Sequence, residues 1–393
     1  MSFLTVFLAR LSIGPLAPFF KESLNLSNTQ VGALVSATGI AQIPSLLAAG
    51  WLVDHIGAHR VLAMGTFVTS LSILALFFAP SYQVMFAILV ISGLGCGCIF
   101  PSIVKSIISW FPMRERATAL GLNQTAINVA GITGATLLPT VAITLGWRYG
   151  FLFLGCGALA ICLCVVIFYR SSPQEELPIA AGNTPNEAST KSSTAQPAIN
   201  LFKSRDIWMV ILTGFFLTTV EFSAIAYLVL YLNEVLLFSA VIAGGLLAMT
   251  EAAGAVAKPA SGLATDRLFG GRPKIIFLIM SVTTTIIFFT LGIGGHQVRW
   301  LIYPVLIILG MVAIGWGGLW ATMLGELGGK TSVGMISGTG AAANIMGLMG
   351  GPVLFGYIVD STDSFQTAWL VMALISILSV VSLSLVRENK RQV

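Results

Sequence analysis

The chain has 393 residues, of which 9% are charged and 56% are apolar, and its mean hydropathy is +0.93. A water-soluble globular domain carries roughly a quarter charged residues, so this chain cannot cover a water-facing surface and lipid must be its main solvent. The net charge of +5 lies mostly in short loops and therefore does not indicate nucleic-acid binding.

Apolar runs of about 20 residues recur along the chain, and each can cross a hydrocarbon core of about 30 Å as one helix. We predict an all-α membrane protein with twelve transmembrane helices. The predicted spans are 2–20, 29–53, 60–79, 83–108, 117–143, 148–169, 206–232, 238–263, 275–294, 299–323, 332–358 and 365–386. Most of the 20 Lys and Arg residues fall between spans on one side, which predicts an inner-membrane protein with both termini cytoplasmic.

A short motif repeats at the same point of each half of the chain. Gly50-Trp-Leu-Val-Asp54 follows the second predicted span, and Gly262-Leu-Ala-Thr-Asp266 follows the eighth. Residues 171–204 are rich in Ser, Thr, Pro, Ala and Glu and cannot bury enough apolar surface to fold alone. The sequence therefore predicts two pseudo-symmetric six-helix bundles, 1–170 and 205–393, joined by a cytoplasmic linker.

Several charged residues fall inside the predicted spans, where a charge costs about 2.5–3.5 kcal/mol on insertion scales and is a functional candidate. Arg10 is the first choice for binding an anionic substrate, because its guanidinium matches a carboxylate; the alternative is a packing ion pair. Glu221 and Glu251 are candidate proton carriers, since burial favours the neutral carboxyl. The alternative is that either acid stays paired with Arg10 or Lys258.

Lys258 is either a second substrate cation or a structural counter-charge, and Lys105 either attracts anions at the inner mouth or extends to the interface. Neutral polar residues in the spans either line a cavity or pack helices together. These are Gln42, Asn123, Gln124, Asn128, Tyr227 and Asn344. The stretch from Gly315 to Trp320 either lines or gates a substrate cavity or only packs against neighbouring helices. The cysteine spacing suits no metal site, and no cofactor is expected.

The two six-span halves and the Gly-x-x-x-Asp loops resemble the major facilitator superfamily. The segment from Gly50 through Asp54 and Gly57 to Arg60 is similar to that family's loop motif. The resemblance implies that these residues, with Gly262 and Asp266, form a latch that breaks as the halves rock. The alternative is that they only anchor loops at the membrane surface.

Within the superfamily, three further stretches are similar to the anion:cation symporters of organic acids. They are the Gly93-Leu-Gly95-Cys-Gly97 run leading to Pro101 and Lys105, then Trp110-Phe111-Pro112, and Gly146-Trp147-Arg148. Members of that group often carry an Arg and a Glu where this chain has Leu89 and Cys96.

Together these features predict a monomeric secondary transporter, not an enzyme, that moves a small organic anion (a carboxylate) by proton symport with rocker-switch alternating access. Sodium is the alternative coupling ion. The alternative function is a proton-coupled exporter of cationic or lipophilic compounds, with Glu221 and Glu251 facing the compound. A transporter-like receptor is disfavoured because no signalling domain is appended, and an enzyme because no nucleophile–base pair or metal cluster is assembled.

Overall fold

The computed structural model describes residues 2–110, 116–169, 204–269, 272–294 and 301–387. The first half contains α1 (Ser2–Leu11), α2 (Ile13–Leu24), α3 (Asn28–Ile56), α4 (Ala58–Ala75), η1 (Leu76–Phe78), α5 (Tyr82–Trp110), α6 (Arg116–Thr144) and α7 (Trp147–Phe168). The second half contains α9 (Arg205–Glu234), α10 (Ala240–Leu268), α11 (Pro273–Gly294), α12 (Ile302–Leu309), the π-helix η3 (Gly310–Ile314), α13 (Gly317–Thr362) and α14 (Phe365–Ser384).

The twelve-helix membrane fold predicted from the apolar runs is confirmed. Within the described residues, 11 helical segments are long and apolar enough to cross a membrane. The long helix α13 belongs to two of these segments: its first part completes the segment Ile302–Leu327, and its second part forms the segment Ile336–Thr362. The twelfth crossing is α3, a helix of 29 residues that packs against α5 and α13. The first crossing is made by α1 and α2, which join at Ser12 with helical backbone angles (φ −72°, ψ −23°).

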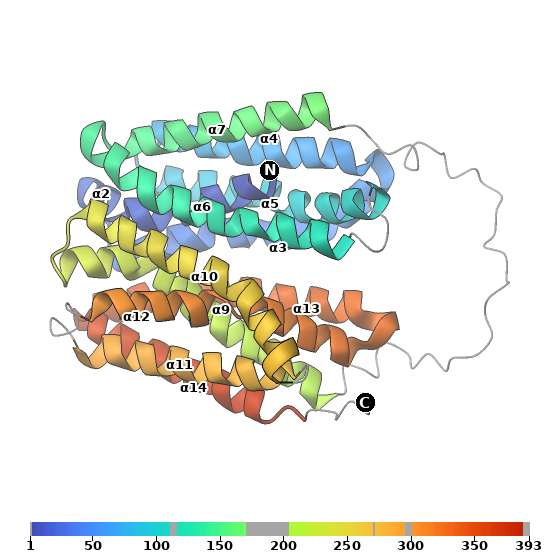
Figure 1. The fold of residues 1–393 in the computed structure, drawn as a ribbon. Coiled ribbons are helices and arrows are strands. Elements are labelled where there is room, and N and C mark those ends of the chain that lie inside the picture. Colours follow the sequence, from blue (N-terminus) through green and yellow to red (C-terminus); the bar gives the residue numbers. More distant parts are fainter. Residues whose placement is uncertain (1, 111–115, 170–203, 270–271, 295–300, 388–393) are drawn as a thin grey trace, which may run out of the picture.

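The helices form two bundles that lie side by side (Figure 1). Helices α1–α7, coloured blue to green, make the N-terminal bundle, and α9–α14, coloured yellow-green to red, make the C-terminal bundle. The bundles meet where α3 packs on α13, α6 on α10 and α2 on α9. The predicted linker lies almost wholly outside the described residues, so the bundle limits 1–170 and 205–393 stay predictions.

Polar contacts between the bundles gather at the end that carries residues 25–27, 235–239 and 363–364, which we call the closed end (left in Figure 1). There the Asp360 carboxylate of α13 accepts hydrogen bonds from the backbone N–H groups of Asn28 and Thr29, at 2.8 and 2.7 Å, and from both side chains. These N–H groups are free donors because they begin α3, so a carboxylate of one bundle caps a helix of the other. Lys21 pairs with Glu234 nearby, at 2.8 Å.

The same contact continues along α3 toward the middle of the molecule. A Cβ added to Gly32 would lie 2.2 Å from the Pro352 carbonyl oxygen, so only glycine permits this approach of α3 to α13. One turn further, the Ser36 hydroxyl donates to the Met349 carbonyl at 2.5 Å. A Cβ on Gly50, near the opposite end, would meet no described atom within 4 Å. Along the contact of α3 with α13, the close approach therefore lies toward the closed end.

We predict that Asp360→Asn loosens the closed end, because an amide cannot accept all the hydrogen bonds that the carboxylate accepts. The bonds are solvent-exposed, so the loss is about 1 kcal/mol, or roughly a fivefold shift toward separated bundles. Ser36→Cys is the reporter, since Ser36 is only 5% exposed within this contact. A membrane-impermeant maleimide should label this cysteine about fivefold faster when Asp360→Asn is also present than when Asp360 is unchanged.

The control is Asp363→Asn, three residues along the chain, for which the described residues offer no side-chain hydrogen-bond partner. Chains without Ser36→Cys give the background, because Cys156 and Cys164 are exposed. Equal labelling rates for the Asp360 and Asp363 variants would show that the cap does not hold the bundles together.

Candidate functional site

Arg10 lies in the last turn of α1, two residues before Ser12, and is 4% exposed. Its Nε and Nη2 atoms donate to the Thr38 hydroxyl at 3.1 and 3.0 Å, and Nη2 also donates to Gln42 Oε1 at 2.6 Å. Both partners are neutral. Within the described part of the chain, no carboxylate lies within 4.0 Å of the guanidinium, so the charge is buried without a counter-ion.

The bonds of Arg10 leave part of its guanidinium free. A guanidinium has five N–H donors, and the bonds to Thr38 and Gln42 use Nε–H and both N–H groups of Nη2. Nη1 has no acceptor among the described residues. Thr38 and Gln42 therefore fix the plane of the group and leave one edge for another acceptor.

Thr38 was not among the residues predicted from the sequence. It lies one turn before Gln42 on α3, so the two side chains share a helix face. Gly93 of α5 packs against this point, since a Cβ there would lie 2.1 Å from the Thr38 carbonyl oxygen. Cys96 lies about one turn further along α5 and is 2% exposed. The signal available in the sequence was a hydroxyl four residues before the amide of Gln42 inside a predicted span.

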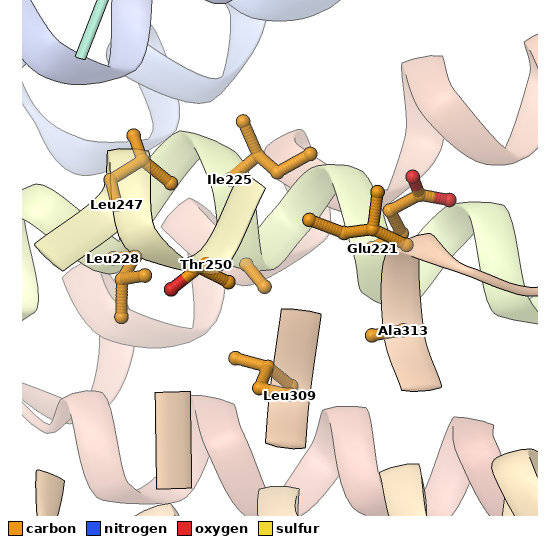
Figure 2. A pocket seen from close by; sticks show the side chains of 9 residues that line it. Glu221, Ile225, Leu228, Leu247, Thr250, Leu309 and Ala313 are labelled. Atoms are coloured by element: carbon orange, nitrogen blue, oxygen red, sulfur yellow. The ribbon is translucent and has the colours of Figure 1, made fainter. Parts of the chain in front are cut away.

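Glu221 of α9 lies inside the C-terminal bundle. The Trp316 indole, just after the π-helix η3, donates to Glu221 Oε2 at 3.1 Å. Glu221 borders a cavity of about 10 Å³, which Leu228, Leu247, Thr250 and Leu309 also line (Figure 2). In that view the carboxylate points away from the other labelled side chains. A volume near that of one water molecule excludes an organic substrate.

Glu251 of α10 lies where the two bundles touch. It is 1% exposed, and a Cβ added to Gly131 of α6 would lie 2.9 Å from Glu251 Oε2. Glu251 Oε1 has no hydrogen-bond partner among the described residues. Lys258 follows on the same helix and donates to Asn128 of α6 at 3.2 Å.

The predicted alternative in which Arg10 or Lys258 forms a structural ion pair with Glu221 or Glu251 is not seen. No such pair lies within 4.0 Å across the described residues. The charge of Lys258 nevertheless acts on both Glu221 and Glu251, so these three groups form one electrostatic cluster.

Several predicted site residues lie elsewhere in the fold. The Tyr227 hydroxyl donates to the Asn28 carbonyl at the closed end, and its ring stacks on Phe355. Lys105 donates to the Val53 carbonyl at 3.0 Å, near the end of α3. Asn344 is half-buried, and its Oδ1 has no hydrogen-bond partner in the described part of the chain; Asn123 is also half-buried. The Gln124 side chain lies outside the described residues.

The repeated loop motif is described only in part. Gly57 has φ +88°, a conformation that favours glycine, and it joins α3 to α4 as the predicted tight turn requires. Arg60 is exposed, and the side chains of Asp54 and Asp266 lie outside the described residues. The close helix contact expected at Gly50 is absent, and Gly262 likewise faces open space, because no described atom approaches either position.

Comparison with known proteins adds to this geometry. Residues 1–344 match the profile of the Major Facilitator Superfamily. The chain is 23% identical to a probable sulfoacetate transporter of Cupriavidus necator, over 94% of this chain and 88% of that protein. It is also 23% identical to the hexuronate transporter of Bacillus subtilis, over 93% of this chain and 87% of that protein.

The fold is similar to the crystal structure of a D-xylose–proton symporter, with a TM-score of 0.80 at 16% identity over 99% of this chain and 96% of that chain. The family profile spans the whole N-terminal bundle and most of the C-terminal one. The resemblance predicted from the repeated loop is therefore confirmed, and the family and its relatives are transporters, not enzymes. This chain belongs to the Major Facilitator Superfamily and is a multi-pass membrane transporter.

Proposed function

We propose that this transporter moves a small organic anion together with protons across a bacterial-type inner membrane. The observation that supports this most strongly is the buried Arg10 guanidinium, which has neutral partners and one free edge. A carboxylate, sulfonate or phosphate oxygen arriving at Nη1 would accept that edge and neutralise the charge. Sulfoacetate and hexuronates, named for two relatives, carry such groups.

Proton coupling follows from charge balance. An anion entering a cell works against a membrane potential that costs about 2.3 kcal/mol per charge for each 100 mV. Carrying one proton with a monovalent anion removes this cost, and a buried carboxyl is a suitable carrier because its protonated form is uncharged. Glu251 is buried and Glu221 is half-buried, and they lie near the middle of α10 and α9.

The distribution of Lys and Arg orients the transporter. It puts the termini in the cytoplasm and the closed end outside, so the arrangement described here would open toward the cytoplasm. Rocking of the two bundles would break the Asp360 cap and expose the space between them to the other side.

The alternative, export of cationic or lipophilic compounds, is less well supported. It requires Glu221 and Glu251 to face the compound. Glu221 borders a space of about 10 Å³, and Glu251 packs against Gly131. Glu251 therefore has no space beside it for an organic cation, and the cavity next to Glu221 holds no more than about one water molecule.

We predict that Arg10→Ala lowers uptake of labelled sulfoacetate and D-glucuronate into proteoliposomes by about a hundredfold. Two hydrogen bonds to a charged group, together about 3 kcal/mol, are lost. Arg10→Lys keeps the charge but not the planar edge, and should lose about tenfold. Arg148→Ala is the control, because Arg148 is exposed and its guanidinium lies over the Trp147 ring.

Uptake by Arg10→Ala at the unsubstituted rate would refute the assignment of Arg10 as the anion anchor. Efflux of a lipophilic cation, with no uptake of either acid, would favour the exporter instead.

We predict that uptake stops when a protonophore collapses an inward proton gradient, and that replacing sodium with potassium changes nothing. The reason is that the proposed carrier is a carboxyl, which becomes neutral when it binds a proton. Labelled uptake and external alkalinisation should be recorded together. Uptake that requires sodium and leaves the external pH constant would contradict proton symport.

A further inference from the structure

We infer that Glu251, rather than Glu221, is the acid whose proton controls the contact between the two bundles. The inference rests on the proposed proton symport and assigns it to one side chain. The observations that carry it are the position of Glu251 on the interface and the lack of a partner for one carboxyl oxygen among the described residues.

Helices α6 and α10 contact each other at successive points along α10. Gly244, Glu251 and Lys258 are spaced seven residues apart on α10, which puts them on one helix face at successive two-turn steps. Gly244 meets α6 at the Ala135 carbonyl, Glu251 meets it at Gly131, and Lys258 meets it at Asn128. The Glu251 carboxyl therefore lies within the surface along which the bundles separate.

The charge state of Glu251 decides whether this surface closes favourably. A carboxylate that is 1% exposed and has an unpartnered oxygen is costly, whereas the protonated group is neutral. Charged groups that act on it are Lys258 on its own helix and Glu221 from α9. Among the described residues, α6 presents Gly131 and Asn128 here, η3 carries no ionisable side chain, and the one ionisable side chain of α12, Tyr303, is exposed.

Lys258 does not remove this cost in the arrangement described. Its ammonium donates to Asn128 of the other bundle and forms no ion pair with Glu251 within 4.0 Å. When the bundles part, Lys258 loses Asn128 and Glu251 loses Gly131, so the ammonium and the carboxylate become free to approach each other or water.

Glu221, unlike Glu251, has its named neighbours within its own bundle. Its hydrogen-bond donor, Trp316, and the side chains around its cavity all belong to the C-terminal bundle. Rocking of the bundles as rigid bodies leaves these immediate neighbours unchanged, so the free energy of protonating Glu221 depends on the arrangement only through the charges of Glu251 and Lys258. Proton binding at Glu251 therefore favours the arrangement with the closed end shut, and proton loss favours separation.

The test is hydrogen–deuterium exchange of the segments 28–31 and 356–362 in the purified full chain, without substrate. Labelling is done at about pH 5.5 and about pH 8, on either side of the range where buried carboxyls titrate, with times scaled for chemical exchange. The unsubstituted chain should exchange about tenfold faster at the higher pH, as expected if the two arrangements differ tenfold in proton affinity. Glu251→Gln should be equally protected at both values, and Glu221→Gln should keep the difference.

Loss of the pH dependence in Glu221→Gln, its persistence in Glu251→Gln, or its absence from the unsubstituted chain would each overturn the inference. Anion uptake is measured separately, so its failure would refute the proposed function without changing these exchange results.

A second variant covers the case in which Glu251→Gln does not fold. Gly131→Ala adds a methyl group within 2.9 Å of the Glu251 carboxylate, so it should speed exchange at both pH values. In a Glu251→Ala chain the added methyl group no longer meets the Glu251 carboxylate, so Gly131→Ala should not change the exchange rate. An equal effect of Gly131→Ala in both chains would show that Glu251 does not govern this contact.

Discussion

The arrangement of the whole molecule depends on a buried positive charge that its own bundle does not neutralise. Arg10 is held by Thr38 and Gln42, two neutral side chains of α3, near the point where α1 joins α2. A buried cation without a counter-ion is destabilising, and it persists where an anion from outside supplies the missing charge. The helix that fixes Arg10 is also the helix that joins the two bundles, because α3 packs along α13.

This shared use of α3 links binding to movement. Its first turn is capped by Asp360 of the other bundle, its middle passes close to Pro352 and Met349, and its Thr38–Gln42 face holds Arg10. The α6–α10 contact is the counterpart on the other side of the molecule, and it contains Glu251 and Lys258. An anion at Arg10 and a proton at Glu251 would therefore act on two interfaces between the same pair of rigid bundles.

The sequence predicted the twelve crossings, the two bundles and the buried charges, because long apolar runs and rare charges in lipid are strong one-dimensional signals. It could not predict which buried groups meet. Spacing along one helix placed Glu251 and Lys258 on a common face, but only packing reveals that this face touches Gly131 and Asn128 of the other bundle. Tyr227, predicted to line a substrate site, lies in the closed-end contact, because neighbouring helices determine its surroundings.

An organic anion bound at the free edge of Arg10 should be visible in a density map of the full chain prepared with sulfoacetate or D-glucuronate. We expect an anionic oxygen about 2.7–2.9 Å from Nη1 of Arg10, with Thr38 and Gln42 still bound to the rest of the guanidinium. Density for the anion away from α1 and α3, with Nη1 paired to a protein carboxylate, would contradict this expectation.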